Sequence, residues 1–354
     1  MHYWMSSKRR TMNSNGTKEN KNMNITSLAT PLNIQTPDLA LMSTSLNIMN
    51  NNLVTADVLY SKTLYLNNLY ERFKRINKTI MVERQRLGES SDRLRIEIES
   101  RTVILREYEQ ELNAAKDQAD ISEIQEERAH ILTSSITMIG TEANRLANVL
   151  SEMKEAFDRQ QTLDFQKGLE KDVIQKTGRI EATTNQLATL QEERRVLSEA
   201  IDAIESKGFA TIAKDTLLTA EKVIALGLQP PQIAVVTLAI EQMKATLEYG
   251  AEGLNFIALI KRRDSLRERI EKLFEELAQR EQEKLALAQR IELIECFHTM
   301  DDQRSVYVEQ YQKIVQTVDS FVALNKALAT DDEERSARFI RSGLQLTSYL
   351  QPIR

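Results

Sequence analysis

Histidine and cysteine, the side chains that most often carry out catalysis or bind metals, are scarce in this 354-residue chain. The three histidines, His2, His130 and His298, lie far apart and lack the short spacing of a metal site. Cys296 lies two residues before His298, and on a helix this spacing turns the two side chains in different directions. There is no glycine-rich phosphate loop. We therefore expect no catalytic site, metal, cofactor or small-molecule substrate, and the chain is not predicted to be an enzyme.

A second set of polar residues has a spacing that does suggest a function. Six polar side chains follow one another at intervals of four, three, four, four and three residues. On one helix, here predicted from Gln232 to Ile260, that spacing confines them to an arc of roughly 80°. The rest of this helix is mainly apolar, so it needs an apolar environment with a single wet side. The polar stripe consists of Thr237, Glu241, Lys244, Glu248, Glu252 and Asn255.

Two environments meet that need. A protein core with one solvated edge is the one that the pattern alone favours. The alternative is a lipid bilayer in which the stripe faces a water-filled pore, since about 20 residues of helix span the 30 Å or so of hydrocarbon. The place of the segment at the apex of an elongated protein favours the bilayer. The residues then expected to meet lipid are Phe209, Leu217, Val223, Leu226, Ile233, Val236, Leu238, Ile240, Met243 and Leu247.

The charges in the stripe set a condition on insertion. The large apolar residues between positions 232 and 252 contribute about −2 to −4 kcal/mol in total on the insertion scale. Each charge held at the lipid centre costs about 2.5–3.5 kcal/mol, so Glu241, Lys244 and Glu248 together outweigh that gain. A single copy is therefore predicted not to span a membrane. Insertion is expected only where several copies surround water and form the wall of a pore.

Glycine and proline mark a turn and a set of predicted hinges. The turn is the tip of an apolar helical hairpin predicted over 209–260. The hinges lie where this hairpin joins the long helices on either side, here called the stalk. Proline fits the first turn of a helix, so a new helix is expected just after the tip. Single glycines ordinarily reflect close packing, but glycines at both junctions between hairpin and stalk predict hinges. The tip turn is assigned to Gly227, Pro230 and Pro231. The hinges are assigned to Gly208, Gly250 and Gly253.

Long helices must position this hairpin. Glycine and proline number only 10 and 5, and charged residues make up 28%, which is the composition of long helices. Apolar residues at alternating three- and four-residue steps predict two coiled-coil runs, 171–208 and 261–297, on either side of the hairpin 209–260. Paired antiparallel, these runs form a stalk with the hairpin at its tip. The predicted fold is all-α and elongated.

A helical bundle is expected at the base of the stalk, built from residues 37–170 together with 298–354. Apolar spacing predicts helices over 39–80 and roughly 90–160, and Thr330 to Glu333 resembles a capping box that begins a last helix. Residues 1–36 are rich in Asn and are interpreted as a disordered leader without a signal peptide, so secretion by a non-classical route is expected. The net charge of −5 and one short basic block at 8–10 do not indicate nucleic-acid binding.

The order of bundle, coiled-coil stalk and apical apolar hairpin resembles the α-helical pore-forming toxins of the cytolysin A type. The stalk heptads and the segment KGFATIAKDTLLTAEKVIALGLQPPQIAVVTLAIEQMKATLEYGAEG look most like the B components of the α-xenorhabdolysin type, over about residues 39 to 350. This resemblance implies a soluble monomer that forms a hetero-oligomeric ring with a similarly built A component. It also implies that the segment from Phe209 to about Ile260 swings out and forms a pore in a host cell membrane. A coiled-coil scaffold whose hairpin binds a partner protein is the alternative interpretation.

Overall fold

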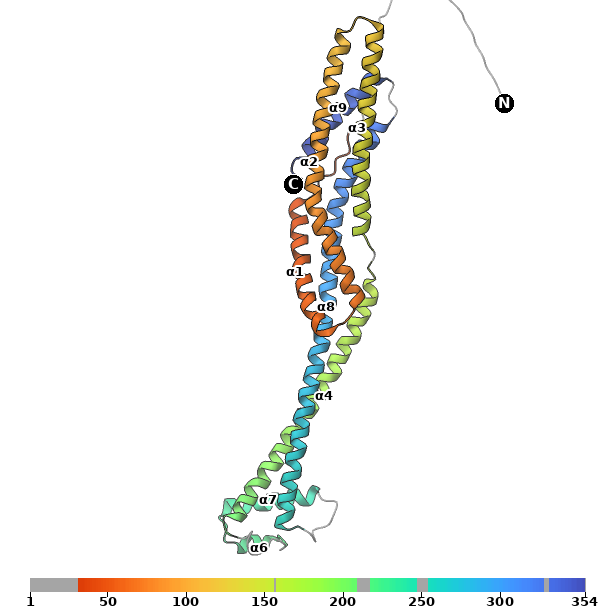
Figure 1. Ribbon diagram of the computed structural model, residues 1–354. Helices are drawn as coiled ribbons and strands as arrows, with labels where there is room; N and C mark the ends of the chain where they lie inside the picture. Colours follow the sequence, from red (N-terminus) through yellow and green to blue (C-terminus); the bar gives the residue numbers. More distant parts are fainter. Residues whose placement is uncertain (1–30, 156, 209–216, 247–253, 328–330, 354) are drawn as a thin grey trace, which may run out of the picture.

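The computed structural model describes residues 31–155, 157–208, 217–246, 254–327 and 331–353. Within these ranges the regular elements are all α-helices, arranged as a long rod, which confirms the predicted all-α and elongated fold (Figure 1). They are α1 (Leu39–Thr63), α2 (Asn67–Ala114), α3 (Gln118–Met153), α4 (Arg159–Glu205), α6 (Ala220–Ala225), α7 (Pro230–Thr246), α8 (Phe256–Lys326) and α9 (Asp332–Leu350).

α8 connects all parts of the rod. Its 71 residues form one helix of about 105 Å. In the wide half of the rod α8 packs with α1, α2, α3 and α9, and farther along it packs against α4 alone (Figure 1). At the end of the rod opposite the bundle, the first turn of α8 shares an apolar cluster with α6 and α7. The rod therefore consists of a bundle, a two-helix stalk and a small apical group of helices that share one continuous helix.

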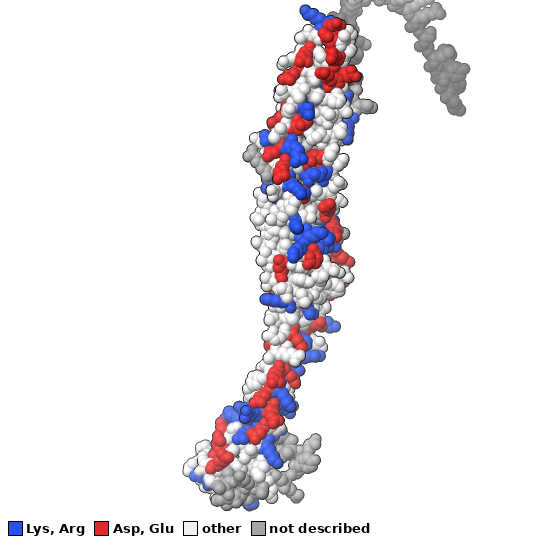
Figure 2. Space-filling view, viewed as in Figure 1, with Lys and Arg blue, Asp and Glu red and all other residues white. Residues whose placement is uncertain are grey.

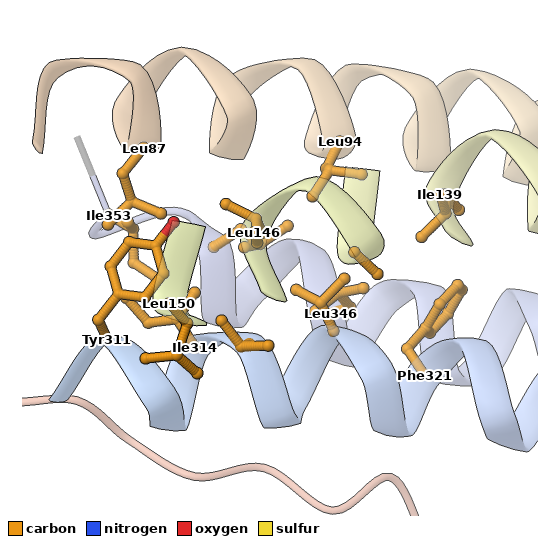
Figure 3. Packing of buried hydrophobic residues seen from close by; sticks show 14 of the residues in the cluster. Leu87, Leu94, Ile139, Leu146, Leu150, Tyr311, Ile314, Phe321, Leu346 and Ile353 are labelled. Atoms are coloured by element: carbon orange, nitrogen blue, oxygen red, sulfur yellow. The ribbon is translucent and has the colours of Figure 1, made fainter. Parts of the chain in front are cut away.

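The bundle has a continuous apolar core along its length. Figure 3 shows Leu87 and Leu94 of α2, Leu146 of α3, Phe321 of α8 and Leu346 of α9 packed together, and each of them is at most 2% exposed. Burial of one such side chain contributes about 1.5–3 kcal/mol. Because helices α1, α2, α3, α8 and α9 all contribute to one apolar cluster, this half of the molecule is firmly held together.

The stalk is an antiparallel pair of α4 and α8, as the spacing of apolar residues predicts. The predicted seam residues of α4 are buried along the run, including Ile180, Leu190 and Ile204. Polar residues interrupt the seam on both helices, and there Arg280 donates a hydrogen bond to the buried hydroxyl of Thr183. A polar pair at a core position specifies the register of a coiled coil. The pair thus fixes how far along α8 the end of α4 lies.

The segment predicted as one helix over 39–80 is split in two, so that prediction is wrong. α1 ends at Thr63 and α2 begins at Asn67, and the turn between them has Leu64 and Leu66 in the left-handed region, with φ of 47° and 55°. No glycine or proline marks this turn in the sequence. Packing around the turn favours it, since Tyr60 stacks on Tyr70 with ring centroids 4.1 Å apart.

Three other predicted boundaries also differ from the structure. The helix predicted over roughly 90–160 is interrupted at Asp117, whose carboxylate accepts a hydrogen bond from the amide of Ala119 and caps α3. The last helix is capped by Asp331, which accepts from the amide of Glu334 at 2.7 Å, one residue later than the predicted capping box. Residues 31–36, predicted as part of the leader, lie in extended conformation against α8.

We predict that Leu64→Gly stabilises the protein. A left-handed conformation costs an L-residue about 1–2 kcal/mol, and Leu64 is 71% exposed, so little packing is lost. Glycine also loses more entropy on folding, which leaves a net gain of about 0.5–1 kcal/mol. The measurement is the free energy of unfolding in urea.

The matched control is Ile174→Gly, since Ile174 is an equally exposed aliphatic residue (73%) in the interior of α4. There glycine meets ordinary helical geometry and should destabilise by about 0.5–1 kcal/mol. A loss of stability in both variants would show that the turn stores no strain.

Candidate functional site at the apex of the stalk

The apex of the rod holds the segment that the sequence singled out. We call residues 217–246 and 254–260 the head; they lie where α4 ends and α8 begins (Figure 1). α6 is followed by a turn at Gly227, with φ of 65°, and α7 begins at Pro230. The amide of Gln229 donates to Oε1 of Gln232 at 3.0 Å, which is the reach-back half of a capping box. The predicted tip residues therefore lie in this turn and in the first turn of α7.

One side of α7 is covered by apolar residues of the same chain. The covering residues come from the end of α4, from α6 and the turn after it, and from the first turns of α8. On α7 the covered side consists of Val236, Ala239, Ile240 and Met243, each at most 5% exposed. α7 thus occupies a protein core with one solvated edge, which is the environment that the pattern alone favoured.

The predicted polar stripe is divided between several parts of the head. Thr237 is half-buried, while Glu241 and Lys244 are exposed on the solvated side of α7. Glu248 and Glu252 lie outside the described residues. The stripe residues that the structure describes on α7 therefore share one wet edge beside the apolar core.

Asn255 does not continue α7, so the prediction of a single helix from Gln232 to Ile260 is wrong for this structure. α7 ends at Thr246, and Asn255 has the extended backbone of an N-cap residue, with φ of −124° and ψ of 174°. Its side-chain oxygen accepts a hydrogen bond from the amide of Ala258 at 2.9 Å and so starts α8. The final member of the predicted stripe is thus a cap of the stalk helix here.

A short backbone pairing joins the segments that enter and leave the head. We call Leu217, Leu218, Leu254 and Asn255 the clasp. Leu217 and Asn255 form an isolated antiparallel bridge, and the amide of Leu218 donates to the carbonyl of Leu254 at 2.8 Å. Leu218 and Leu254 are both buried in the head core. The sequence contains no signal for this clasp, because a pairing of one or two residues has no periodicity.

The residues predicted to meet lipid fall into two groups. Val223, Val236, Ile240 and Met243 are buried, and Leu226 and Ile233 are half-buried. Leu217 and Leu238 are exposed by 41% and 44%. Phe209 and Leu247 lie outside the described residues. Ile224 was absent from the predicted set although it is 63% exposed, because its place on the outer side of a six-residue helix is set by packing.

One predicted hinge lies within the described chain. Gly208 follows the last turn of α4 with φ of 71°, a conformation that favours glycine, and a Cβ atom placed there would meet nothing within 4 Å. The backbone, rather than close packing, is therefore the reason for glycine at this position. Gly250 and Gly253, the other predicted hinges, lie outside the described residues.

Cys296 and His298 lie far from the head, where the stalk joins the bundle. Burial raises the pKa of the Cys296 thiol to about 11, with Glu292 and Glu295 adding to the shift. His298 is buried, its Nε2 is 2.8 Å from the hydroxyl of Thr162, and burial together with Arg159 lowers its pKa. The two side chains thus have different surroundings. Among the described residues no group of His, Cys, Asp and Glu side chains is placed to hold a metal ion.

Within the described ranges, no helix has both the length and the hydropathy of a membrane span.

Comparison with solved structures identifies proteins with the same arrangement of bundle, stalk and head. PaxB from Photorhabdus luminescens matches 91% of this chain and 98% of its own, at 18% identity and a TM-score of 0.71. XaxB from Xenorhabdus nematophila matches 86% and 96%, at 19% identity and a TM-score of 0.69. The chain has the XaxB fold. A chain of the XaxAB pore complex from the same organism matches over 90% and 99%, at 15% identity and a TM-score of 0.53.

The XaxB fold confirms, at the level of structure, the resemblance to α-xenorhabdolysin B components that the stalk and hairpin indicate. The TM-score against the chain from the pore complex is lower than the scores against PaxB and XaxB. No family profile and no curated protein matches the sequence.

We predict that Asn255→Ala weakens the junction between head and stalk. Loss of an N-cap side chain costs about 0.5–2 kcal/mol, here at the point where α8 starts and the clasp closes. Hydrogen exchange of the amides of Ala258 and Leu259 should become faster, while exchange in the bundle stays unchanged. Asn255→Asp keeps a capping oxygen and is the matched control. If Asn255→Asp accelerates exchange as much as Asn255→Ala, the cap is not what holds the junction.

Proposed function

We propose that this chain is the B component of a two-component α-helical pore-forming toxin. It would assemble with an A component of similar build and insert the α7 segment into the membrane of a target cell. The observation that carries the proposal is α7 itself, a mostly apolar helix with one polar edge, at the tip of the stalk of a chain that has the XaxB fold. The likeness to a chain of the XaxAB pore complex supports the assembly. The monomer described above is then the soluble form that precedes the pore.

The first step in this proposal is contact between the closed head and lipid. Ile224, Leu238 and Leu217 are already exposed in the closed form. They therefore contact a bilayer without any rearrangement of the core. Figure 2 shows both signs of charge along the stalk and bundle. The charged side chains of the described head residues are Glu221, Lys222, Glu241 and Lys244. This distribution makes the head the end of the rod that is best suited to a lipid surface.

The second step is release of α7 from the head core. Exposing Val236, Ile240 or Met243 to water costs about 1.5–3 kcal/mol for each side chain, so the head stays closed in water. Lipid removes most of that cost because it is as apolar as the core that the helix leaves. The clasp must open for α7 to move away from α8, and Gly208 supplies backbone freedom on the α4 side.

The third step is assembly, which accommodates the charges of the stripe. Glu241 and Lys244 are hydrated on the closed head and must stay hydrated after insertion. A ring of subunits provides a water-filled lumen on that side of each helix. We propose that Thr237, Glu241, Lys244, Glu248, Glu252 and Asn255 line this lumen, which requires the chain between α7 and α8 to become one helix. The A component promotes this assembly.

Dye release from liposomes tests the function. We predict slow release by this chain alone, because the isolated charged helix is unfavourable in lipid by a few kcal/mol, and fast release when an A component is added. Efficient release at nanomolar concentration by this chain alone would contradict the two-component mechanism. No release even with the A component, together with stable binding to another protein through the head, would support the scaffold alternative.

A disulfide across the clasp provides the matched control. Leu217 and Asn255 are directly opposed in an antiparallel bridge, where Cα atoms lie about 4.5–5.5 Å apart, within the range of a disulfide. Leu217→Cys with Asn255→Cys should give an oxidised protein that is inactive with the A component, and reduction should restore release. Cys296 need not be replaced, because it is buried and its raised pKa keeps it unreactive. Full release by the verified oxidised form would show that the clasp stays closed in the pore.

Ion selectivity tests the assignment of the stripe. It carries three carboxylates and one ammonium, so each subunit adds about two negative charges to the wall at neutral pH. We predict mild cation selectivity that fades as salt rises, since charges are screened over about 8 Å at physiological ionic strength. Glu241→Lys with Glu248→Lys should shift the reversal potential toward anions while leaving assembly intact.

The control for this prediction is Leu238→Glu. Leu238 is 44% exposed in the closed head, so the monomer should fold normally, but on the inserted helix the new charge faces lipid and should block release. Val236→Glu does not serve this purpose, because Val236 is fully buried and its replacement would disrupt the closed head. Unchanged selectivity in the double Lys variant, or full activity of Leu238→Glu, would show that the faces are wrongly assigned.

A further inference from the structure

Residues 31–38 form an extended segment, here called the strap, that lies along α8 in the bundle. Its backbone amides donate hydrogen bonds to side chains of α8. The amide of Gln35 donates to Thr317 Oγ1 at 3.0 Å, and that of Asn33 to Ser320 Oγ at 3.3 Å. The amide of Asp38 donates to Gln310 Oε1 at 3.0 Å. The strap therefore runs antiparallel to α8, and Figure 3 shows an extended segment beside that helix.

The side chains that receive these hydrogen bonds form an ordered row on α8. Gln310, Thr317 and Ser320 are seven and three residues apart, which places them on one face of the helix. Gln310 is 4% exposed and Thr317 is fully buried. Buried polar groups need hydrogen-bond partners, and here the partners of these acceptors include peptide amides of the strap. The row is thus built to receive an extended backbone.

Two further contacts fix the position and direction of the strap. The side chain of Leu32 is 7% exposed and belongs to the apolar core of the bundle. The hydroxyl of Tyr349, on α9, donates to the carbonyl of Gln35 at 3.0 Å. The strap therefore contacts α8 and α9 at the same time, with one apolar anchor and hydrogen bonds to both its amides and a carbonyl.

The strap is also separable from the helices around it. Asp38 is the N-cap of α1, and its carboxylate accepts a hydrogen bond from the amide of Leu41 at 2.8 Å. A chain that starts at Pro37 would keep this cap. Because the strap makes no backbone ladder with a strand, its removal would leave the hydrogen bonds within α1, α8 and α9 intact.

We propose that this face of α8 and α9, here called the seat, is a binding site for an extended peptide with a leucine anchor. The seat consists of Thr317, Ser320 and Tyr349, and its resident ligand is residues 31–36 of the chain's own strap. Asp38, which bonds Gln310, stays with α1 as its N-cap. The tether to α1 keeps the strap at a high effective concentration and so favours this occupant. With the strap in place, α9 is latched to α8; with it removed, the seat accepts the same peptide in trans. The proposal is independent of pore formation.

Peptide binding to a shortened chain tests the proposal. The protein is the chain lacking residues 1–36, and the probe is a fluorescein-labelled synthetic peptide of residues 28–36, followed by fluorescence anisotropy. We expect saturable binding. A peptide with Leu32→Asp should bind at least about tenfold more weakly, because it loses the burial of one leucine side chain.

The seat itself is tested by a matched pair of substitutions in the same shortened chain. Thr317→Val removes a seat hydroxyl and should weaken peptide binding. Thr299→Val makes the same change on α8 outside the seat, where the hydroxyl donates only to the carbonyl of Glu295, and should leave binding unchanged. Absence of saturable binding, equal binding of the Leu32→Asp peptide, or equal effects of the two valine substitutions would overturn the proposal.

A second measurement on the full chain covers the case in which the shortened chain does not fold. Leu32→Cys places a thiol at the buried anchor, and Ile34→Cys places one at a position of the strap that is 41% exposed. The thiol at position 32 should react with a maleimide at least about tenfold more slowly, which corresponds to about 1.4 kcal/mol. Adding Thr317→Val should speed the reaction at position 32 and not at position 34. Equal rates at the two positions would overturn the proposal.

Discussion

The apolar face of α7 can be covered by protein or by lipid, but not by both at once. In the monomer it is covered by the end of α4, the first turns of α8 and the α6 turn. Three features of the head position the residues that cover this face. The clasp joins the segment before α6 to the start of α8, and the Asn255 side chain caps the first turn of α8. The turn at Gly227 brings α6 into contact with α7. In the function proposed above, insertion replaces the protein contacts of this apolar face with lipid contacts.

The rest of the molecule differs from the head in how tightly it is held. In the bundle, Arg145 of α3 binds Glu83 of α2 at 3.0 Å, Glu142 at 2.9 Å and the hydroxyl of Ser90 at 2.7 Å. Because the Glu83 carboxylate in this network is buried, loss of Arg145 would leave that charge without a partner on α3, so the network joins α2 to α3. The head has no comparable ion-pair network among its described residues. We therefore expect local opening to begin at the apex.

The parts of this fold that repeat were predictable from the sequence, whereas the breaks between helices that no glycine or proline marks were not. The stalk follows from the three- and four-residue spacing of residues such as Ile180, Leu187 and Ile204, because the same packing rule applies at each turn. The turns that separate successive helices could not be predicted from this spacing. Leu64 and Leu66 adopt left-handed geometry under the influence of tertiary contacts, and a leucine gives no local sign of this. The row of polar residues from Thr237 to Asn255 was continuous in sequence, but its last member caps another helix.

In the candidate site, too, features set by local residues were predictable and features set by distant contacts were not. The tip turn was predictable because Gly227 and Pro230 act through their own backbones. The solvated edge at Glu241 and Lys244 was predictable from helical periodicity. The clasp and the exposure of Ile224 depend on which distant residues meet in space, and the pattern alone could not decide whether the apolar face of α7 meets protein or lipid.

The single cysteine has a consequence for where this protein can keep its structure. Cys296 is enclosed by apolar side chains, and its thiol stays protonated at any physiological pH. Thiolate is the form that reacts with oxidants and disulfides, so this side chain is protected from both. With no second cysteine in the chain, no internal disulfide has to form or be broken. The state of its cysteine therefore stays the same in reducing and in oxidising surroundings, and folding of this chain requires no disulfide to form.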